Sequence, residues 1–533
     1  MNGKIKSANG FAMKLEAYLN PSWINKRNAS IILGSILIFT AIVRISTIDS
    51  PALDRTDWKE IDHIMISKNY YENGYKFLYP EVDWPAENPR YTAMELPIAP
   101  FIAGLLYGVF GYNVYTVRIL TFFAFLLLIF FSYKLVRREA GLFLALMTAL
   151  LAGILPLSNQ FNKYLFSEPL LLFFSVFSVF YYAEWVDKKK VWQLVLFIIG
   201  FSLAISLKPT CLYLGLPLLW IHYRANGLKL KRYLSFFLTM IVCLILPVWW
   251  YSHAYYLANN YIDVFGVFGG QFGGHDKFQT IGMLSDPQWW ATMYFRMKRM
   301  LLGNMGLLML AIGVVYSAYS SKGRLFLYYL LSVLLFFMIV AEGNLDTTYR
   351  QLTIIPPAAF FISLGFITTS TFLYHLAKRT GAHKMTCKIL AVAIPLGLLL
   401  FFPLKRFDIY EVPNKETAVH KTNWLLAEQI KINSPGTKKM VLAGGYTTHK
   451  GGNDLSPILY YYSDLQGWSI QEGEWEEETI EKYFDKGATI FAATGYSREE
   501  ELAKFVQTLK TKYKIIYYNP EKGLLLLDLT QKL

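Results

Sequence analysis

The sequence predicts a mostly α-helical integral membrane protein with a small α/β domain at its C-terminal end. Hydrophobic residues make up 54% of its 533 residues, and the mean hydropathy is +0.31. A water-soluble protein has too little interior to bury so much apolar surface. Charged residues make up only 17% and gather between long apolar runs, which is the pattern of repeated membrane spans.

The chain carries a net charge of +14 at neutral pH. A strongly basic chain often binds nucleic acid, but here the positive residues occupy short segments between the apolar runs. They therefore predict membrane topology, and we expect membrane lipids and no nucleic acid among the partners. The three cysteines lie in or beside apolar runs, without the spacing of a metal site or a disulfide framework.

Eleven apolar runs approach the ~20 residues that a helix needs to cross a bilayer. They lie at residues 29–47, 114–134, 140–157, 166–185, 191–207, 209–222, 233–252, 300–319, 325–341, 352–376 and 386–404. Lysines and arginines precede the first run, so residues 1–28 are predicted to form a cytoplasmic N-terminus before an uncleaved first span.

A further run at residues 96–111 is short and contains Pro97 and Pro100. If this run lies along the outer surface, almost every short loop rich in Lys and Arg falls on the cytoplasmic side. If it crossed the bilayer, every later loop would oppose that rule. We therefore predict a juxtamembrane helix here, about eleven spans within residues 29–404, and an extracytoplasmic domain at 405–533.

Residues 49–113 and 256–298 form the two long loops predicted outside. The first holds ten carboxylates against five Lys or Arg residues, and its spacing predicts an amphipathic helix over 59–73 that stops at Gly74. Loops of this length usually have a function. The second is rich in glycine and aromatic residues, which favours either an interfacial anchor or a substrate-gating loop.

Apolar runs shorten after residue 405 and alternate with helical patterns. We expect helices at 416–432, 455–465, 476–486 and 497–513, with strands at 438–444, 488–493, 514–518 and 523–528. This alternation predicts a small α/β domain. Its paired glycines mark turns but do not complete a phosphate-binding fingerprint.

Ionisable residues gather at the predicted outer face of the membrane. They are Asp57, Glu60 and Asp62 after the first span, Glu95 before Pro97, Glu168 at the fourth span, and Tyr349-Arg350 at the tenth, with Lys163 and Lys208 on the same side. Each has a structural explanation: Ser167-Glu168-Pro169, for example, is a good helix start. Several acids and bases on one face of a multi-span protein nevertheless favour a site.

Three segments of the first outer loop carry a resemblance to a known family. Thr56-Asp57-Trp58-Lys59-Glu60-Ile61-Asp62, residues 67–74 and residues 77–84 are similar to the first outer loop of bacterial GT-C glycosyltransferases. These are membrane enzymes that use polyprenyl-phosphate sugars and are related to the lipid A aminoarabinose transferases and the protein O-mannosyltransferases. Glu95-Leu96-Pro97-Ile98, Leu207-Lys208-Pro209-Thr210 and Tyr349-Arg350-Gln351-Leu352 also resemble family patterns in the same order. The resemblance covers about residues 29–405 and implies a GT-C-like fold.

What the resemblance implies is the inverting transfer of a sugar from a polyprenyl-phosphate donor to a lipid, glycan or protein acceptor. The reaction would take place on the outer face of the bacterial cytoplasmic membrane. The family places a carboxylate of the first outer loop as catalytic base; Asp57 matches it best, with Glu60 and Asp62 as alternatives. Relatives often have an acidic pair where this chain has Lys59-Glu60.

The leaving group in such a reaction is a lipid phosphate, so a cation must meet its developing charge. Arg350, Lys208, Lys163 and Arg296 are the candidates, with Tyr349 beside them as a substrate contact. A divalent metal ion held by Glu95 or Glu168 is the alternative.

Two other classes of function compete with the enzyme. A transporter or lipid flippase would show internal repeats and charges at the midplane, and the sequence shows no half-to-half repeat. A scaffold that binds a partner through its C-terminal domain would have no need of the acidic first loop.

Overall fold

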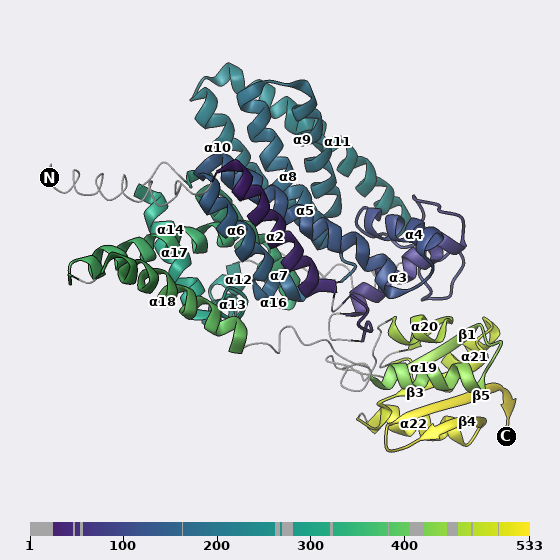
Figure 1. Ribbon diagram of the computed structural model, residues 1–533. Helices are drawn as coiled ribbons and strands as arrows, with labels where there is room; N and C mark the ends of the chain where they lie inside the picture. The colour runs from purple at the N-terminus through teal and green to yellow at the C-terminus, as the bar shows by residue number, and fades with distance from the viewer. Residues whose placement is uncertain are drawn as a thin grey trace.

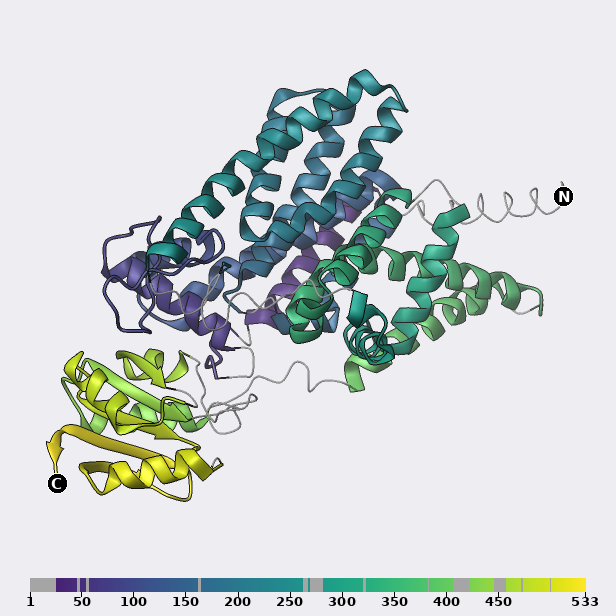
Figure 2. The same cartoon turned by 180° about the vertical axis from the view of Figure 1, so that it is seen from behind.

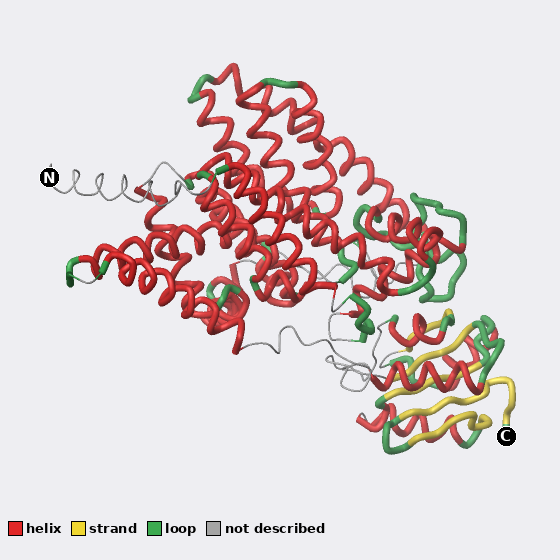
Figure 3. The backbone as a smooth tube through the Cα atoms, in the orientation of Figure 1, coloured by secondary structure: helices red, strands yellow, loops and turns green. Residues whose placement is uncertain are grey.

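The computed structural model describes residues 25–45, 48–53, 57–161, 164–261, 267–268, 281–319, 323–381, 383–405, 421–444, 457–470, 473–498 and 500–533. A long helical bundle occupies the first three quarters of the chain, and all strands lie in the C-terminal domain (Figures 1 and 3).

The helices before the second outside loop are α2 (Lys26–Ile45), α3 (Asp57–Glu72), α4 (Ile98–Phe110), α5 (Val114–Ala140), α6 (Leu142–Ile154), α7 (Pro156–Phe161), α8 (Ser167–Lys188), α9 (Val191–Leu207), the 3₁₀ helix η1 (Pro209–Leu214), α10 (Gly215–Asn226) and α11 (Leu230–Asn260). Those after it are α12 (Ile281–Leu284), α13 (Pro287–Met300), α14 (Gly303–Tyr319), α15 (Arg324–Ile339), α16 (Ala341–Asp346), the 3₁₀ helix η2 (Thr348–Ile354), α17 (Ile355–Lys378) and α18 (Lys384–Lys405).

Each of the eleven predicted spans is helical in the described residues. Within the described residues, six helices are long and apolar enough to cross a bilayer alone. The pair α13 and α14, bent by 99°, makes a seventh if it forms one broken span. The helices α6, α9 and α15 are apolar but shorter. The multi-pass membrane fold is confirmed, while helix length alone does not fix the number of crossings.

Helix α3 lies at one end of the bundle with α4 packed against it (Figures 1 and 2). The prediction of a helix here is confirmed, and Gly74 follows it with a φ of +89°, which suits a glycine. The helix is not amphipathic, because residues 60–67 are buried on every side. It therefore lies inside the outer end of the bundle rather than on the membrane surface.

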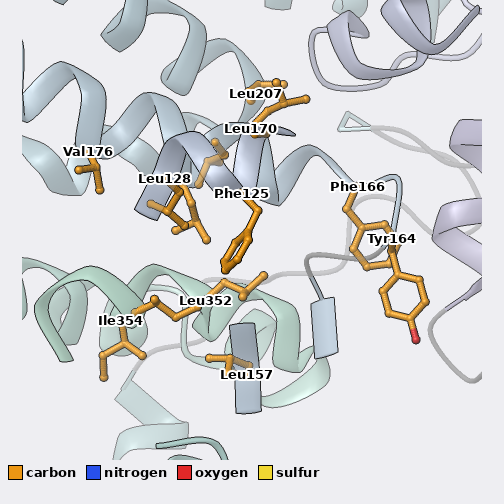
Figure 4. Close-up of a cluster of buried hydrophobic side chains, with 14 of the residues drawn as sticks. Phe125, Leu128, Leu157, Tyr164, Phe166, Leu170, Val176, Leu207, Leu352 and Ile354 are labelled. Atoms are coloured by element: carbon orange, nitrogen blue, oxygen red, sulfur yellow. The ribbon is translucent and has the colours of Figure 1, made fainter. Parts of the chain in front are cut away.

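The apolar core of the helical bundle is formed by residues from distant parts of the chain. Figure 4 shows Phe125 and Leu128 of α5, Leu170 of α8 and Leu352 of η2 in one cluster of buried side chains. This apolar support fixes the outer ends of α5, α8 and η2 relative to one another.

The C-terminal domain contains α19 (Lys421–Asn433), β1 (Lys439–Gly444), α20 (Ile458–Ser463), β2 (Gln466–Ile470), α21 (Glu477–Asp485), β3 (Ile490–Thr494), the 3₁₀ turn η4 (Tyr496–Arg498), α22 (Glu500–Lys510), β4 (Tyr513–Asn519) and β5 (Leu524–Lys532). The strand order is β2-β1-β3-β5-β4, in which β1 pairs parallel with β2 and β3, and β5 pairs antiparallel with β3 and β4.

The predicted α/β character of this domain is confirmed, and each predicted helix and strand is present with somewhat different bounds; β4 and β5 are longer than predicted. The sequence analysis missed β2. It begins Gln-Gly-Trp, without the alternation of apolar and polar residues that marks a strand. The domain lies beside α3 and α4 in both views of the molecule (Figures 1 and 2).

Candidate active site

Helix α3 presents three chemically active side chains on one face. Lys59, Asp62 and His63 are spaced i, i+3 and i+4, so they point the same way from the helix. All three line a cavity of about 630 Å³ at the end of the bundle where α3 lies. Because α3 is buried around its full circumference, these side chains are held at fixed positions.

A neighbouring face of α3 carries Glu60, which is fully buried and forms a closed pair with Arg118 of α5. The guanidinium donates from Nε to Oε1 at 2.8 Å and from Nη2 to Oε2 at 2.6 Å. Glu60 also accepts from the backbone N–H of Leu165 at 2.8 Å, and Arg118 donates to the carbonyls of Ile48 and Ser50. This cluster ties the end of the first span to α3 and α5, and Glu60 is not part of the cavity lining.

The cavity side contains a second acid–base cluster that joins four segments. The ammonium of Lys59 lies 3.3 Å from Oε1 of Glu168, at the start of α8, and 3.8 Å from Oε1 of Glu95. Lys208, which follows α9, donates to the same oxygen of Glu168. Two lysines therefore share one buried carboxylate.

Tyr349 and Arg350 of η2 complete the polar part of the cavity. The ammonium groups of Lys59 and Lys208 lie 4.6 Å and 4.8 Å from the centre of the Tyr349 ring, within cation–π range. The Nε of Arg350 has no hydrogen-bond partner among the described residues. A Cβ at Gly343 would lie only 2.3 Å from Nη1 of Arg350, so the glycine makes room for the guanidinium.

Burial dominates the ionisation of Asp62. It raises the pKa of this carboxyl well above its ordinary value, and Trp84 and Lys59 oppose the rise only in part. Its Oδ1 has no hydrogen-bond partner within the described part of the chain. Asp62 is thus a carboxylate of raised basicity that lines the cavity with an unengaged oxygen.

The protonation states of three neighbouring groups, His63, Lys59 and Glu95, follow from burial and nearby charges. Burial and the nearby Lys59 charge lower the pKa of His63, whose Nδ1 lies 2.7 Å from the Lys59 carbonyl, so the neutral ring donates there and leaves Nε2 as an acceptor. Burial alone would lower the pKa of Lys59, but Glu168, Tyr349 and Glu95 more than reverse this and hold it charged. Burial likewise opposes ionisation of Glu95, and Lys59 and Lys208 overcome it, so the pKa of Glu95 falls.

The rest of the cavity is apolar. Its wall is formed by side chains of α8, α9, η1, α11 and α15, namely Leu171, Leu172, Ile205, Leu212, Leu244, Val248 and Phe336. Val267 and Phe268 of the second outside loop also line it, and the N–H of Val267 donates to the carbonyl of Ala93 at 2.9 Å. A polar end and an apolar wall in one cavity suit an amphipathic ligand.

The residues do not fit the divalent metal ion that the sequence analysis assigned to Glu95 or Glu168. The ammonium group of Lys59 lies beside the Oε1 atoms of both glutamates, and that of Lys208 beside Glu168, so a divalent ion there would be repelled by two positive charges at close range. No group of three or more His, Cys, Asp or Glu residues within the described ranges is arranged to hold a metal. The positive charge beside these carboxylates is supplied by the protein itself.

The structure brings together six of the ten site residues suggested by the sequence: Asp62, Glu95, Glu168, Lys208, Tyr349 and Arg350. Two others lie elsewhere. Glu60 pairs with Arg118, and Arg296 donates to the carbonyls of Asn344 and Leu345 at the end of α16. Asp57 begins α3, but its side chain and all of Lys163 lie outside the described residues.

Sequence reasoning missed Lys59 and His63 as members of the site. Both lie within the segment that drew attention, and the i, i+3, i+4 spacing from Lys59 through Asp62 to His63 was the available signal. Only the carboxylates of that segment were predicted as site residues.

The fold is similar to that of solved membrane glycosyltransferases of the GT-C architecture. The chain is similar to the crystal structure of ArnT from Cupriavidus metallidurans, solved both in the apo state and bound to undecaprenyl phosphate, with a TM-score of 0.60 and 12% identity. That similarity covers 93% of this chain and 97% of the apo structure. The Archaeoglobus fulgidus oligosaccharyltransferase matches with a TM-score of 0.57 and 12% identity, over 95% of this chain and 75% of its own.

Residues 92–251 also match the family model described as dolichyl-phosphate-mannose-protein mannosyltransferase. No curated protein matches the chain by sequence. The resemblance to GT-C proteins predicted from the sequence is thus confirmed at the level of the fold, and the family model covers less than half of the chain.

Proposed function

We propose that this protein transfers a sugar from a polyprenyl-phosphate donor to an acceptor on the extracytoplasmic face of the membrane. The observation that carries the proposal is the single cavity in which Lys208 and Arg350 meet Asp62 above an apolar wall. Similarity to ArnT, which was crystallised with undecaprenyl phosphate, supports a lipid phosphate as the donor.

The charges of the cavity favour an anionic ligand. Lys59, Lys208 and Arg350 contribute three positive charges, against Glu95, Glu168 and, when it is ionised, Asp62. Lys59 and Lys208 lie against Glu168, whereas the Nε of Arg350 has no hydrogen-bond partner among the described residues and is available to an anion. Lys208 has three N–H donors, of which the structure engages one with Glu168. The phosphate of a lipid carrier would bind between Lys208 and Arg350, and the planar guanidinium matches two phosphate oxygens.

The apolar wall from α8, α9, η1 and α11 would hold the first isoprene units of the donor. It continues from the polar end of the same cavity, so a lipid phosphate can place its headgroup on the cations while its tail remains apolar. A free nucleotide sugar would leave this wall unfilled.

Asp62 is the base that the geometry favours. The acceptor oxygen or nitrogen forms a bond to the anomeric carbon and gives its proton to the Asp62 carboxylate. The bond between the anomeric carbon and the phosphate oxygen breaks with its electron pair remaining on the phosphate, whose charge Arg350 and Lys208 stabilise. Attack from the side opposite the phosphate inverts the anomeric carbon.

Lys59 has a different role in this scheme. Its ammonium is held between Glu95 and Glu168, so it keeps the two carboxylates together and orients Glu168 toward Lys208. The lysines and the arginine together supply the positive charge that the sequence analysis had assigned to a metal ion.

A turnover assay with the purified full chain in nanodiscs tests the proposal. A panel of undecaprenyl-phosphate sugars is supplied with lipid, glycan and peptide acceptors, and released undecaprenyl phosphate is measured by mass spectrometry. We expect release with at least one pair, and loss of that release in Lys208→Met. Movement of the lipid between leaflets without loss of its sugar would instead establish a flippase and overturn the enzyme.

A further inference from the structure

Four buried side-chain atoms of the cavity lining have no hydrogen-bond partner among the described residues. Three of them are acceptors, namely Oδ1 of Asp62, Nε2 of His63 and Oε2 of Glu168, and one is a donor, Nε of Arg350. The three residues that carry the acceptors are at most 4% exposed. A buried acceptor without a partner destabilises the protein, so these atoms call for a ligand with O–H or N–H groups.

The hydrogen bond of His63 to its own helix decides which ring nitrogen is left over. Its Nδ1 lies 2.7 Å from the carbonyl oxygen of Lys59, which can only accept, so Nδ1 carries the proton and donates. In the neutral ring Nε2 is then an acceptor. Burial and the nearby charge of Lys59 lower the pKa of His63, which keeps the ring in this form.

The two acceptors of α3, Asp62 and His63, lie on either side of Lys59 around the helix axis. At 3.6 residues per turn, Asp62 is about 60° to one side of Lys59 and His63 about 40° to the other. All three side chains line the same cavity. The two acceptors therefore reach a ligand from directions about 100° apart, so they contact two separate groups rather than share one.

Neighbouring side chains do not supply the missing donors, since Lys59 and Lys208 both lie against Oε1 of Glu168. The bound substrates must therefore present at least two O–H or N–H groups to α3, and one of these is the nucleophile at Asp62. Isoprene units carry no polar group, and the oxygens of a phosphodiester only accept. A sugar hydroxyl is the part of the substrates that supplies the second group.

We propose that His63 is a specificity-determining residue, because its Nε2 accepts a hydrogen bond from a saccharide hydroxyl next to the group that Asp62 engages. That hydroxyl belongs either to the sugar of the donor or to a saccharide acceptor, and its chemistry is the same in both. The contact selects sugars by one hydroxyl, since an analogue that lacks it leaves a buried acceptor unpaired. This inference rests on the proposed function for the identity of the substrates, while the contact itself is measured as binding.

Binding to the full chain in nanodiscs tests the contact without turnover. The probes for the donor are farnesyl-phosphate glucose, galactose and mannose, and those for the acceptor are the methyl glycosides of the same sugars. Each probe is compared with its monodeoxy analogues by ligand-observed NMR. In one of the two sets, we expect loss of one hydroxyl to weaken binding to the unaltered protein about tenfold. In His63→Leu, the parent sugar and that deoxy analogue should bind equally.

Two further variants separate the role of Nε2 from that of the helix. His63→Gln keeps an acceptor in its side-chain carbonyl, so it should retain part of the preference for the hydroxyl. Ser67→Ala is the matched control, because Ser67 donates to the His63 carbonyl at 2.6 Å, as His63 donates to that of Lys59, but does not line the cavity. It should keep the full preference. Farnesyl phosphate without a sugar should bind all variants equally.

The outcomes distinguish this inference from the proposed function. A preference that His63→Leu removes only among the farnesyl-phosphate sugars assigns the hydroxyl to the donor, and one removed only among the methyl glycosides assigns it to the acceptor. Equal or undetectable binding of parent and deoxy sugars in both sets would overturn the inference, as would a preference that survives His63→Leu. Transfer without the preference would leave the proposed function standing, whereas the preference without transfer would leave only a sugar-binding site.

Discussion

Two buried acid–base clusters lie on different faces of α3, and they differ in how completely their charges are matched. On one face, Glu60 and Arg118 are both fully buried, and both oxygens of the carboxylate accept hydrogen bonds from the guanidinium. On the other, Glu168 shares one oxygen between two lysines, while its Oε2 has no partner in the described part of the structure.

This difference separates a structural pair from a binding site. A closed pair has neither charge nor hydrogen-bonding capacity left for a ligand, and its burial is tolerable only because it is complete. The cluster around Glu168 has surplus positive charge and unengaged atoms beside a cavity of about 630 Å³. In this protein, buried charged residues therefore indicate a ligand site only where their ion pairs leave some atoms without a partner.

The largest expected effect comes from Asp62 on the incomplete face. Asp62→Asn keeps the shape of the side chain but cannot accept the acceptor's proton, so sugar transfer should fall by about 10²–10⁴-fold. Donor binding, measured by displacement of labelled undecaprenyl phosphate, should not change. His63→Gln serves as the comparison: a larger loss in this variant than in Asp62→Asn would move the base to His63.

The second effect is on stability and comes from the closed face. Glu60→Ala leaves Arg118 buried without its counter-ion, which should destabilise the fold by about 3–5 kcal/mol. Thermal unfolding in detergent measures the loss. Glu81→Ala is the control, because its pair with Arg90 is partly exposed and should contribute far less. If Glu60→Ala unfolds at the normal temperature but no longer transfers sugar, Glu60 would again be a candidate catalytic residue.

The third effect concerns recognition of the phosphate. Arg350→Lys keeps the charge but loses the planar pair of donors, so kcat/KM for the donor should fall about tenfold to a hundredfold, with stability unchanged. Steady-state kinetics with a fixed acceptor measures this loss. Arg296→Lys is the matched control, because Arg296 donates to backbone carbonyls away from the cavity. Equal losses in both variants would argue against a phosphate at Arg350.

Much of the fold could be predicted from the sequence, because a helix that crosses a bilayer needs a long run of apolar residues and such runs are visible in the hydropathy. Long apolar runs and flanking charges identified every span as a helix, and the break at Pro97 marked the short helix α4. The strand β2 escaped because Gly467 interrupts its pattern. A Cβ at that position would meet the carbonyl of Met440 at 2.1 Å, so this glycine is required by a neighbour that only the folded sheet reveals.

The sequence predicted on which side of the membrane the site would lie, but not which individual side chains would form it. Charge placement indicated that Glu95, Glu168, Lys208 and Arg350 would meet at the outer ends of the spans. It gave no means to tell Glu60 from Asp62, which are two positions apart on α3. Their roles depend on which of them faces Arg118, a contact 58 positions away in the sequence.

A smaller expected effect is the pH-dependent contribution of Asp62 to the stability of the fold. Burial raises its pKa in the folded chain above that in the unfolded chain, so the folded state binds the proton more tightly. This contribution to stability is complete below the unfolded pKa and is lost as pH rises through the folded pKa. Asp62→Asn cannot ionise, so it should have a higher melting temperature than the unaltered protein, with the difference growing toward alkaline pH.

Calorimetry measures this gain over a pH range that begins at about pH 3, below the ordinary Asp pKa of about 3.9, and extends to alkaline pH. Glu87→Gln is the control with the opposite sign, because hydrogen bonds from Lys486 and Trp468 outweigh its burial and lower the pKa of Glu87. A melting difference for Asp62→Asn that is independent of pH would contradict a raised pKa. In that case Asp62 would act as an ordinary carboxylate.

The smallest expected effect is that of a chelator, which should change neither transfer nor melting. The lysine ammonium groups beside Glu95 and Glu168 already neutralise the charge that a divalent ion would offset, and a second cation there would be repelled. Turnover with and without excess EDTA, followed by added Mg²⁺ or Mn²⁺, measures this directly. Loss of transfer in EDTA and its recovery with metal would show that Lys59 moves away on donor binding. In Lys59→Met the two glutamates lose their shared cation, so a gain of metal dependence in that variant alone would demonstrate that the lysine occupies the place of an ion.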